Sequence, residues 1–352
     1  MERCCTLSAG VEAATEILAK VHGIEKALDP LDPDDYLVIV ERLAGQLRTR
    51  TGPIEAAAVR AALQALDVDW TRITPAQRAA AIEASREAIG RARDPVVRAA
   101  RTQLRPTGQR VMQGSRSSVR RALPARFTIQ PVMRARDRTA ERFVRSSTTN
   151  FIRDEFGRRR DDLAELARET VARALEEGLG RDDIGEQLAT AMAGRVARSE
   201  GYWQVVSGAF VNRARTYSQL LSYEEAGISH YIFEAVLDER TTDICRFYHG
   251  QQFTVGGGIR SMNSVMSLED PEEIRSVNPW LRTGRDEDGN RVIWFPRDGE
   301  RVRVAQVDRS GVGSRDDRGS FSRELTPTQL ERAGVPYPPL HGRCRSIIVA
   351  DV

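Results

Sequence analysis

Long apolar runs, cysteines and lysines are all scarce in this sequence of 352 residues. No stretch approaches the run of about 20 apolar residues that a membrane helix needs, and the first residues lack the apolar block of a secretory signal. We therefore expect no membrane partner and a protein that is made and kept in the cytoplasm unless it is packaged. Four cysteines, of which only Cys4 and Cys5 are neighbours, are too few and too scattered for a disulfide scaffold, which leaves free thiols or a metal site.

The scarcity of lysine means that arginine carries the positive charge. Of the 53 basic side chains only Lys20 and Lys26 are lysine, and residues 91–160 contain 19 basic and 5 acidic side chains although the net charge of the chain is +3. Such a cluster attracts a polyanion, nucleic acid first, through phosphate contacts that carry no sequence information. A solvated connector and a face that docks on an acidic protein are the alternatives. The predicted contacts with DNA or an acidic partner are Arg110, Arg116, Arg120, Arg121, Arg126, Arg134 and Arg136.

Apolar residues recur at helical spacing in the first part of the chain, over residues 11–28, 34–47, 54–67 and 76–93. The sequence Thr51-Gly52-Pro53 predicts the end of the second helix, and Thr74-Pro75 predicts an N-cap with proline at the first helical position. We expect residues 1–93 to form a helical N-terminal region, arranged as a small bundle.

The periodicity weakens in the arginine-rich part, where prolines and glycines recur up to Pro131, and residues 94–136 are therefore predicted as an arm or linker. Helical spacing returns over residues 137–227. After Gly227, short stretches rich in β-branched and aromatic residues predict strands, and Gly256-Gly257-Gly258 and Asp288-Gly289 predict loops or turns. The expected fold class is α+β: an N-terminal helical bundle, long central helices, and a small C-terminal α+β domain over 228–352 with a short mixed or antiparallel sheet.

Two short segments about a hundred residues apart each combine a cysteine with a histidine. Cys245 and His249 form C-x3-H, and His341 and Cys344 form H-x2-C. Two thiolates and two imidazoles suit tetrahedral zinc, so the predicted cofactor is one structural Zn held by these four residues. Two other interpretations stay open. Cys245 is a candidate nucleophile with His341 as its base, and the cysteines are alternatively small buried core residues.

The order of features in the second half of the chain resembles the phage head morphogenesis or minor head protein family typified by the F protein of phage Mu. An arginine-bearing helix, RARTYSQLLSYEEAGI, is followed by VLDERTTDIC, by HG, and by a closing PPLHGRCRS, so that the resemblance covers roughly residues 140–350. The predicted domain of this family is 137–352. Besides the cysteines and His341, the positions that match the family motif are Asp238, Arg240, Thr241, Pro338, Pro339 and Arg345.

The sequence departs from the family pattern at the metal ligands. Many relatives resemble C-x2-C in the first segment and H-x2-C-R-C in the second, whereas Thr242 and Ser346 occupy the other two cysteine positions here. Either His249 replaces a lost thiol as a ligand, or the metal is absent and the fold persists without it.

The resemblance implies a minor capsid protein of a tailed phage or prophage that is not an enzyme. Its implied partners are the portal protein, capsid or scaffold proteins and double-stranded DNA. It would be made in the bacterial cytoplasm and located in the virion head or the procapsid interior. A zinc- or thiol-dependent hydrolase or nuclease delivered with the DNA, and a general DNA-binding module, are the alternative functions.

Overall fold

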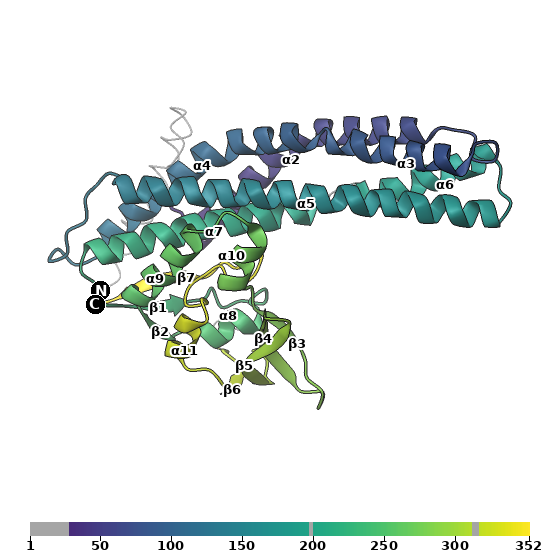
Figure 1. Cartoon of the computed structure of the whole chain (residues 1–352). Coiled ribbons are helices and arrows are strands. Elements are labelled where there is room, and N and C mark those ends of the chain that lie inside the picture. The colour runs from purple at the N-terminus through teal and green to yellow at the C-terminus, as the bar shows by residue number, and fades with distance from the viewer. Residues whose placement is uncertain (1–27, 197–199, 312–316) are drawn as a thin grey trace, which may run out of the picture.

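Long helices lie side by side above a smaller part that contains the strands (Figure 1). The computed structural model describes residues 28–196, 200–311 and 317–352. The predictions for Cys4, Cys5 and the helix over 11–28 fall outside the described residues, apart from Leu28. The long helices are α2 (Pro33–Leu66), α3 (Pro75–Gly90), α4 (Arg93–Ala122), α5 (Ala135–Glu176), α6 (Arg181–Val196) and α7 (Glu200–Glu225). The expected α+β class is confirmed.

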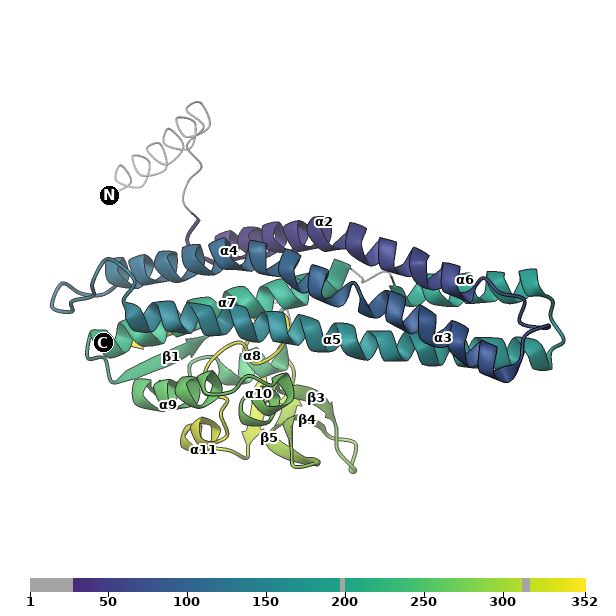
Figure 2. The ribbon, with the colours of Figure 1, turned by 45° about the horizontal axis from the view of Figure 1, so that its top comes forward.

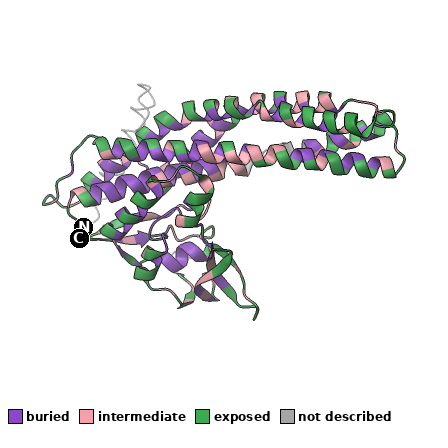
Figure 3. Cartoon of the chain, viewed as in Figure 1, coloured by how far each residue is buried: buried purple, intermediate pink, exposed green. Residues whose placement is uncertain are grey.

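Helices from all three predicted parts of the chain share one bundle. α2, α4, α5 and α7 pack against one another, while α3 and α6 extend the bundle at the end away from the strands (Figure 2). Residues coloured as buried recur along the long helices, interspersed with exposed ones (Figure 3). The buried ones include Leu47, Leu104, Val144 and Phe210, one from each of the four packed helices. Burial of such apolar side chains is the main source of stability for helices of this kind.

The predicted break at Thr51-Gly52-Pro53 is wrong, because α2 continues through Pro53 to Leu66. A proline inside a helix removes one backbone hydrogen bond, which burial on both sides of it offsets here. Leu47 and Leu66 are both buried in the core, and the Thr51 hydroxyl donates a hydrogen bond to the Leu47 carbonyl at 3.0 Å. The predicted N-cap at Thr74 is confirmed as a capping box with Gln77.

The predicted arm over 94–136 is also wrong for most of its length, since residues 93–122 form α4. The helix passes through Pro106, which is exposed, and buries a stripe that includes Leu104, Val111 and Met112. Small or polar residues such as Gly108 and Ser115 occupy other buried positions of this stripe. The spacing of apolar residues alone therefore does not indicate the helix. At Gly108, an added Cβ would lie only 3.0 Å from the Phe210 ring and 3.3 Å from Glu141, so glycine lets the helices approach closely.

The C-terminal part contains two antiparallel sheets instead of the single small sheet that we expected. One has the order β2-β1-β7 and the other β3-β4-β5-β6. Short helices α8 (Asp243–Tyr248), α9 (Val255–Met266), α10 (Pro271–Val277) and α11 (Pro327–Arg332) connect or cover them. The strands are β1 (His230–Glu234), β2 (Gln252–Thr254), β3 (Arg282–Arg285), β4 (Arg291–Arg297), β5 (Glu300–Arg309), β6 (Ser320–Arg323) and β7 (Ile347–Asp351).

Two glycine-rich segments behave differently from each other. Asp288-Gly289 lies in the turn between β3 and β4, where Gly289 has a φ of 82°, as predicted. The triplet that begins at Gly256 is not a loop but the first turn of α9, whose N-cap Thr254 accepts a hydrogen bond from the Gly257 amide. A Cβ on Gly258 would lie 2.7 Å from Leu220, so this glycine is required for the packing of α9 on α7.

Candidate metal site

The two predicted cysteine and histidine segments meet at one place. Cys245 lies on α8, and His341 and Cys344 lie on the segment between α11 and β7. The Cys245 and Cys344 sulfurs are 3.8 Å apart, and the Cys245 sulfur is 3.1 Å from Nε2 of His341. All three ligand atoms lie within 4.8 Å of one another, so these residues can bind a metal ion. We call this group the cysteine–histidine site.

The spacing of the two sulfurs fits tetrahedral zinc. With Zn–S bonds of about 2.3 Å, two sulfur ligands on a tetrahedron lie about 3.8 Å apart, and a sulfur and an imidazole nitrogen about 3.5 Å apart. The observed distance of 3.8 Å between Cys245 and Cys344 agrees with the first value. The His341 ring is slightly closer than the second value and would have to withdraw by less than an ångström. Three protein ligands leave a fourth coordination position for another oxygen or nitrogen donor.

The two thiols differ in acidity. A hydrogen bond with Cys344 lowers the pKa of Cys245, although burial opposes this effect, and the Ser346 and Thr242 hydroxyls act in the same direction. Burial raises the pKa of Cys344 well above its ordinary value. Of the two thiols, Cys245 is therefore the more acidic. A metal ion binds thiolates, so metal binding at this site would release protons and depend on pH.

The prediction of His249 as a fourth ligand is wrong, because this residue is not part of the cysteine–histidine site. His249 is the C-cap of α8, and its Nδ1 accepts a hydrogen bond from the Ala235 amide at 3.1 Å. Burial, and then the charge of Arg318, lowers its pKa. The four-residue spacing from Cys245 would place both side chains on one face only if α8 continued, and it ends at Tyr248.

The positions where the resembled family carries its other two cysteines lie beside the same site. The Thr242 hydroxyl is 3.2 Å from Nε2 of His341 and caps α8 by accepting a hydrogen bond from the Cys245 amide. Ser346 hydrogen-bonds the Cys245 side chain. Hydroxyl groups thus occupy both positions, and both contact residues of the cysteine–histidine site.

The motif residues Asp238 and Arg345 join the two segments next to the cysteine–histidine site. Arg345 donates hydrogen bonds to both carboxylate oxygens of Asp238, one of them at 2.8 Å. Asp238 also accepts hydrogen bonds from the Thr241 hydroxyl and the Arg240 amide, at 2.9 and 3.0 Å. The buried Arg246 donates to the Asp238 carbonyl at 2.7 Å. The Arg240 side chain is exposed, so this motif residue acts here through its backbone.

Because of this ion pair, we expect the free energy of unfolding to depend on pH in the acid range. The hydrogen bonds from Arg345 lower the pKa of Asp238 from 3.8 to about 2. A carboxyl with a lowered folded pKa stabilises the protein fully above its unfolded pKa, and the effect is lost as the pH falls through the folded value. We expect Asp238→Asn to reduce the free energy of unfolding by about 2 kcal/mol at pH 7 and by progressively less as the pH falls from about 4 toward 2. Glu239→Gln, at the exposed neighbour, is the control in urea titrations.

A row of polar side chains on α7 holds the second segment from behind. Asn212 donates to the Cys344 carbonyl at 2.7 Å, and Arg215 donates to the Ser346 carbonyl at 2.8 Å. Further along the same face, Gln219 and Tyr223 both donate to the Ile348 carbonyl. The spacing of these four residues along the helix keeps them on one face. These four contacts were not predicted from the sequence, although the polar residues recur at helical spacing.

Tyr36 of α2 completes this support. Its hydroxyl donates to the carbonyls of Gly208 and Cys344, at 3.2 and 3.0 Å, and the Arg215 guanidinium stacks on its ring at 3.9 Å. Burial raises the pKa of Tyr36 to about 12, so the hydroxyl remains a donor. The N-terminal helices are thereby connected directly to the backbone of the cysteine–histidine site. The motif prolines Pro338 and Pro339 are buried in the segment that leads to His341 and are joined by a cis peptide bond.

The structure divides the seven predicted polyanion contacts into three sets: exposed arginines, one buried arginine, and arginines that pair with carboxylates of the chain. Arg110, Arg120 and Arg126 are exposed. Arg116 is not available to any external partner, because its side chain is completely buried between Asp137 and Glu225. The prediction for Arg116 is therefore wrong. The remaining three pair with carboxylates of the chain itself: Arg121 with Asp29, Arg134 with Glu225 and Arg136 with Glu224.

The contact between Cys245 and His341 also resembles a nucleophile with its base. The sulfur, however, belongs to a residue that is only 4 % exposed, and Cys344 beside it is 1 % exposed. An acyl substrate has to reach the sulfur along a free path and place its oxygen near hydrogen-bond donors. The burial of both cysteines opposes this, and the geometry fits a metal ion better than a substrate.

Comparisons of the chain with protein-family models, with curated proteins and with solved structures find no match. The family resemblance accordingly stands on the motif residues described above. Within the part of the chain that the structure describes, no helix is both long and apolar enough to span a bilayer.

Proposed function

We propose that this protein is a minor capsid protein of a tailed phage or prophage that acts in head morphogenesis. Its partners are the portal protein and capsid or scaffold proteins, and its place is the procapsid interior or the virion head after synthesis in the bacterial cytoplasm. The observation that carries the proposal is the convergence of the motif. Asp238 and Arg345 form an ion pair across 107 positions, and Cys245, His341 and Cys344 meet beside it.

This arrangement favours a structural role over a catalytic one. Asp238 and Arg345 bind each other, Cys245, His341 and Cys344 can hold a metal ion, and the sulfurs are buried. Long helices connected to this centre through Arg215 and Tyr36 form a rigid unit that suits assembly with other proteins. The proposal therefore includes no enzymatic activity.

Sedimentation of particles tests the assembly role. Lysates of the producing bacterium are separated on a density gradient, and the chain is detected by immunoblot in fractions of filled and empty heads. We expect it to sediment with the heads in low copy number and to resist added protease there. Its recovery as free protein at the top of the gradient, with none in either class of head, would contradict the proposal.

We also propose that the cysteine–histidine site holds one structural zinc ion. Elemental analysis of the purified chain is expected to find about one zinc per chain, and the double variant Cys245→Ser/Cys344→Ser to find none. Removal of zinc by a chelator is expected to lower the free energy of unfolding by about 3 kcal/mol when compared with protein at free zinc about 100 times Kd.

His249→Ala is the matched control, because this histidine lies outside the cysteine–histidine site. It should retain the full amount of zinc. Native protein that contains no metal after purification with zinc present would contradict the proposal and leave the cysteines as packing residues. Equal loss of zinc from His249→Ala would show that the ligand set is different.

A further inference from the structure

Part of the positive charge of the predicted arm remains available on the bundle. Four of the seven predicted arginines are paired with carboxylates of the chain, as described above. The other three, Arg110, Arg120 and Arg126, are exposed, and further exposed arginines that pair with no carboxylate of the described residues include five on two neighbouring helices. The five are Arg98, Arg101 and Arg105 on α4, and Arg138 and Arg142 on α5. We call these five residues the basic face.

The exposed carboxylate nearest in sequence to the basic face is Asp94, four residues before Arg98, and it pairs with Arg93. On α4 no acidic residue follows Asp94, and on α5 the only acidic residues before Asp154 are Asp137 and Glu141, which are buried. These two are paired internally, Asp137 with Arg116 and Glu141 with Arg145. The two carboxylates therefore leave the charge of the basic face unneutralised.

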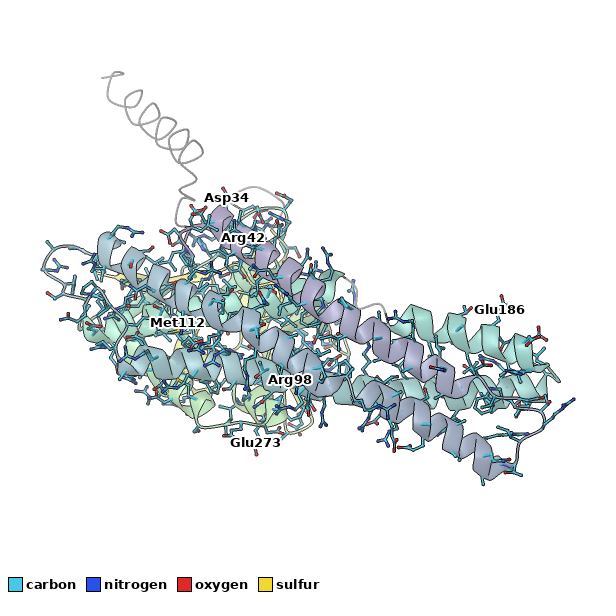
Figure 4. The ribbon with its side chains drawn as sticks, turned by 90° about the horizontal axis from the view of Figure 1, so that it is seen from above. Asp34, Arg42, Arg98, Met112, Glu186 and Glu273 are labelled. Carbon is cyan, nitrogen blue, oxygen red and sulfur yellow. The ribbon has the colours of Figure 1, made fainter. Side chains whose placement is uncertain are left out.

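Two rows of arginines run along the basic face. Seven residues separate Arg98 from Arg105, which is about 10 Å along a helix, and four separate Arg138 from Arg142, which is about 6 Å. α4 and α5 pack side by side, with Gly108 against Glu141, and packed helices lie about 8–10 Å apart. Because Gly108 lies against Glu141 and Arg116 pairs with Asp137, Arg138 and Arg142 lie beside the part of α4 that follows Arg105. The five arginines therefore continue one another along the two helices, as a stripe that can follow a phosphate backbone. Figure 4 shows Arg98 on the outer side of α4, whereas Met112 farther along the helix is buried.

The composition of the basic face distinguishes between the two partners predicted for the arginines, which are nucleic acid and an acidic protein surface. Interfaces between proteins need a desolvated centre with apolar or aromatic anchors. The exposed large hydrophobic side chains of the described residues lie elsewhere: Val38, Val132, Trp280, Val349 and Val352. Binding to a nucleic-acid backbone needs only positive charge and hydrogen-bond donors. The basic face provides these on two rigid helices and offers no aromatic ring for stacking with single-stranded bases.

We propose that the basic face binds the phosphate backbone of duplex DNA without reading its sequence. The inference rests on the proposed head function for its biological setting, because a head protein meets packaged DNA. The binding itself depends only on the five arginines. A failed binding assay leaves the sedimentation result unchanged, and absence of the chain from heads leaves the binding result unchanged, so the two proposals can fail separately.

The test measures the affinity of the full chain for a fluorescent duplex of mixed sequence at a series of salt concentrations. The variant Arg98→Gln/Arg101→Gln/Arg105→Gln retains good helix formers and removes three charges. If each arginine contacts one phosphate, the slope of log K against log salt becomes shallower by about 2.7. We also expect affinity at about 0.1 M salt to fall tenfold or more. The control Arg173→Gln/Arg260→Gln/Arg332→Gln removes three exposed arginines from α5, α9 and α11.

Several results would overturn the inference. One is the absence of binding by the native chain at about 50 mM salt, where non-specific contacts are strong. Another is an equal loss in both triple variants, which would show that net charge and not the basic face is responsible. If the Arg98 triple variant binds duplex as the native chain does but no longer sediments with heads, the basic face belongs to a protein partner. Circular dichroism and urea titration confirm that each variant is folded.

Discussion

Replacement of Arg116 by alanine is expected to lower the free energy of unfolding by about 3–5 kcal/mol. The side chain is fully buried on α4 and reaches two carboxylates, Asp137 on α5 and Glu225 on α7. It also donates to the Gln130 carbonyl at 2.7 Å. Although burial opposes it, hydrogen bonds from Gln130 and Arg116 lower the pKa of Glu225. Without Arg116, the buried Asp137 keeps the neutral backbone amide of Arg134 but loses its ion-pair partner. Glu225 still pairs with Arg134.

Urea denaturation followed by circular dichroism measures this loss. Arg120→Ala on the same helix is the control, since Arg120 is exposed, and it should change stability by no more than about 0.5 kcal/mol. The m value should stay the same in both variants, because the surface exposed on unfolding is unchanged. A loss for Arg116→Ala no larger than that for Arg120→Ala would show that the network contributes little.

The contrast between Arg116 and Arg120 shows why the sequence could not predict the polyanion contacts. Both residues lie in the same arginine cluster, and nothing local distinguishes them. Arg116 is neutralised by Glu225, 109 positions away, and that partner is known only once α7 is placed beside α4. Charge along the sequence predicted that this region attracts an anion. Which arginines remain available was decided by packing.

Two prolines lie inside helices where the local sequence predicts a break. Pro53 and Pro106 predict helix ends from local chemistry, yet α2 and α4 continue through them because long buried faces offset one lost hydrogen bond each. By contrast, the N-cap at Thr74 and the turn at Gly289 were predicted correctly. In those two places the determining interactions are made within a few residues, so that the sequence contains the necessary information.

Three of the four predicted metal ligands could be read from the sequence, because cysteine and histidine are scarce and concentrated in two segments. His249 was the error, since a C-cap residue leaves the helical face that its spacing suggests. The support of the site from α7 and α2 could not be predicted. Asn212, Arg215 and Tyr36 donate hydrogen bonds to backbone carbonyls. Because every residue has a backbone carbonyl, the sequence does not indicate which residue accepts such a bond.

Replacement of Arg215 by alanine is expected to cost about 3–5 kcal/mol of unfolding free energy. Arg215 is completely buried and has no carboxylate partner among the described residues. Its charge is balanced by backbone carbonyls instead, Pro30 at 3.0 Å and both Arg345 and Ser346, and by the face of the Tyr36 ring. Burial lowers its pKa, which shows the cost of its placement. Loss of the side chain leaves buried carbonyl oxygens without this donor and opens a void beside Tyr36.

Arg213→Ala on the same helix is the matched control. Its guanidinium lines the cavity of about 410 Å³ beside Trp280 and Pro296 rather than the segment before β7, so its removal should cost about 1 kcal/mol or less. Arg215→Lys separates charge from geometry, since lysine cannot donate to several carbonyls in one plane or stack on the ring. We expect it to recover less than half of the loss.

The same variants connect stability with the cysteine–histidine site. The carbonyls of Arg345 and Ser346 follow Cys344 directly, so loosening them by Arg215→Ala should weaken zinc binding as well as the fold. Competition with a chromogenic chelator at a temperature where the variant is still folded measures this, with an expected decrease of at least tenfold in affinity. Unchanged zinc affinity in a destabilised variant would separate the α7 support from the site and assign Arg215 to the bundle alone. A parallel decrease would mean that one buried cation fixes both the helices and the metal ligands.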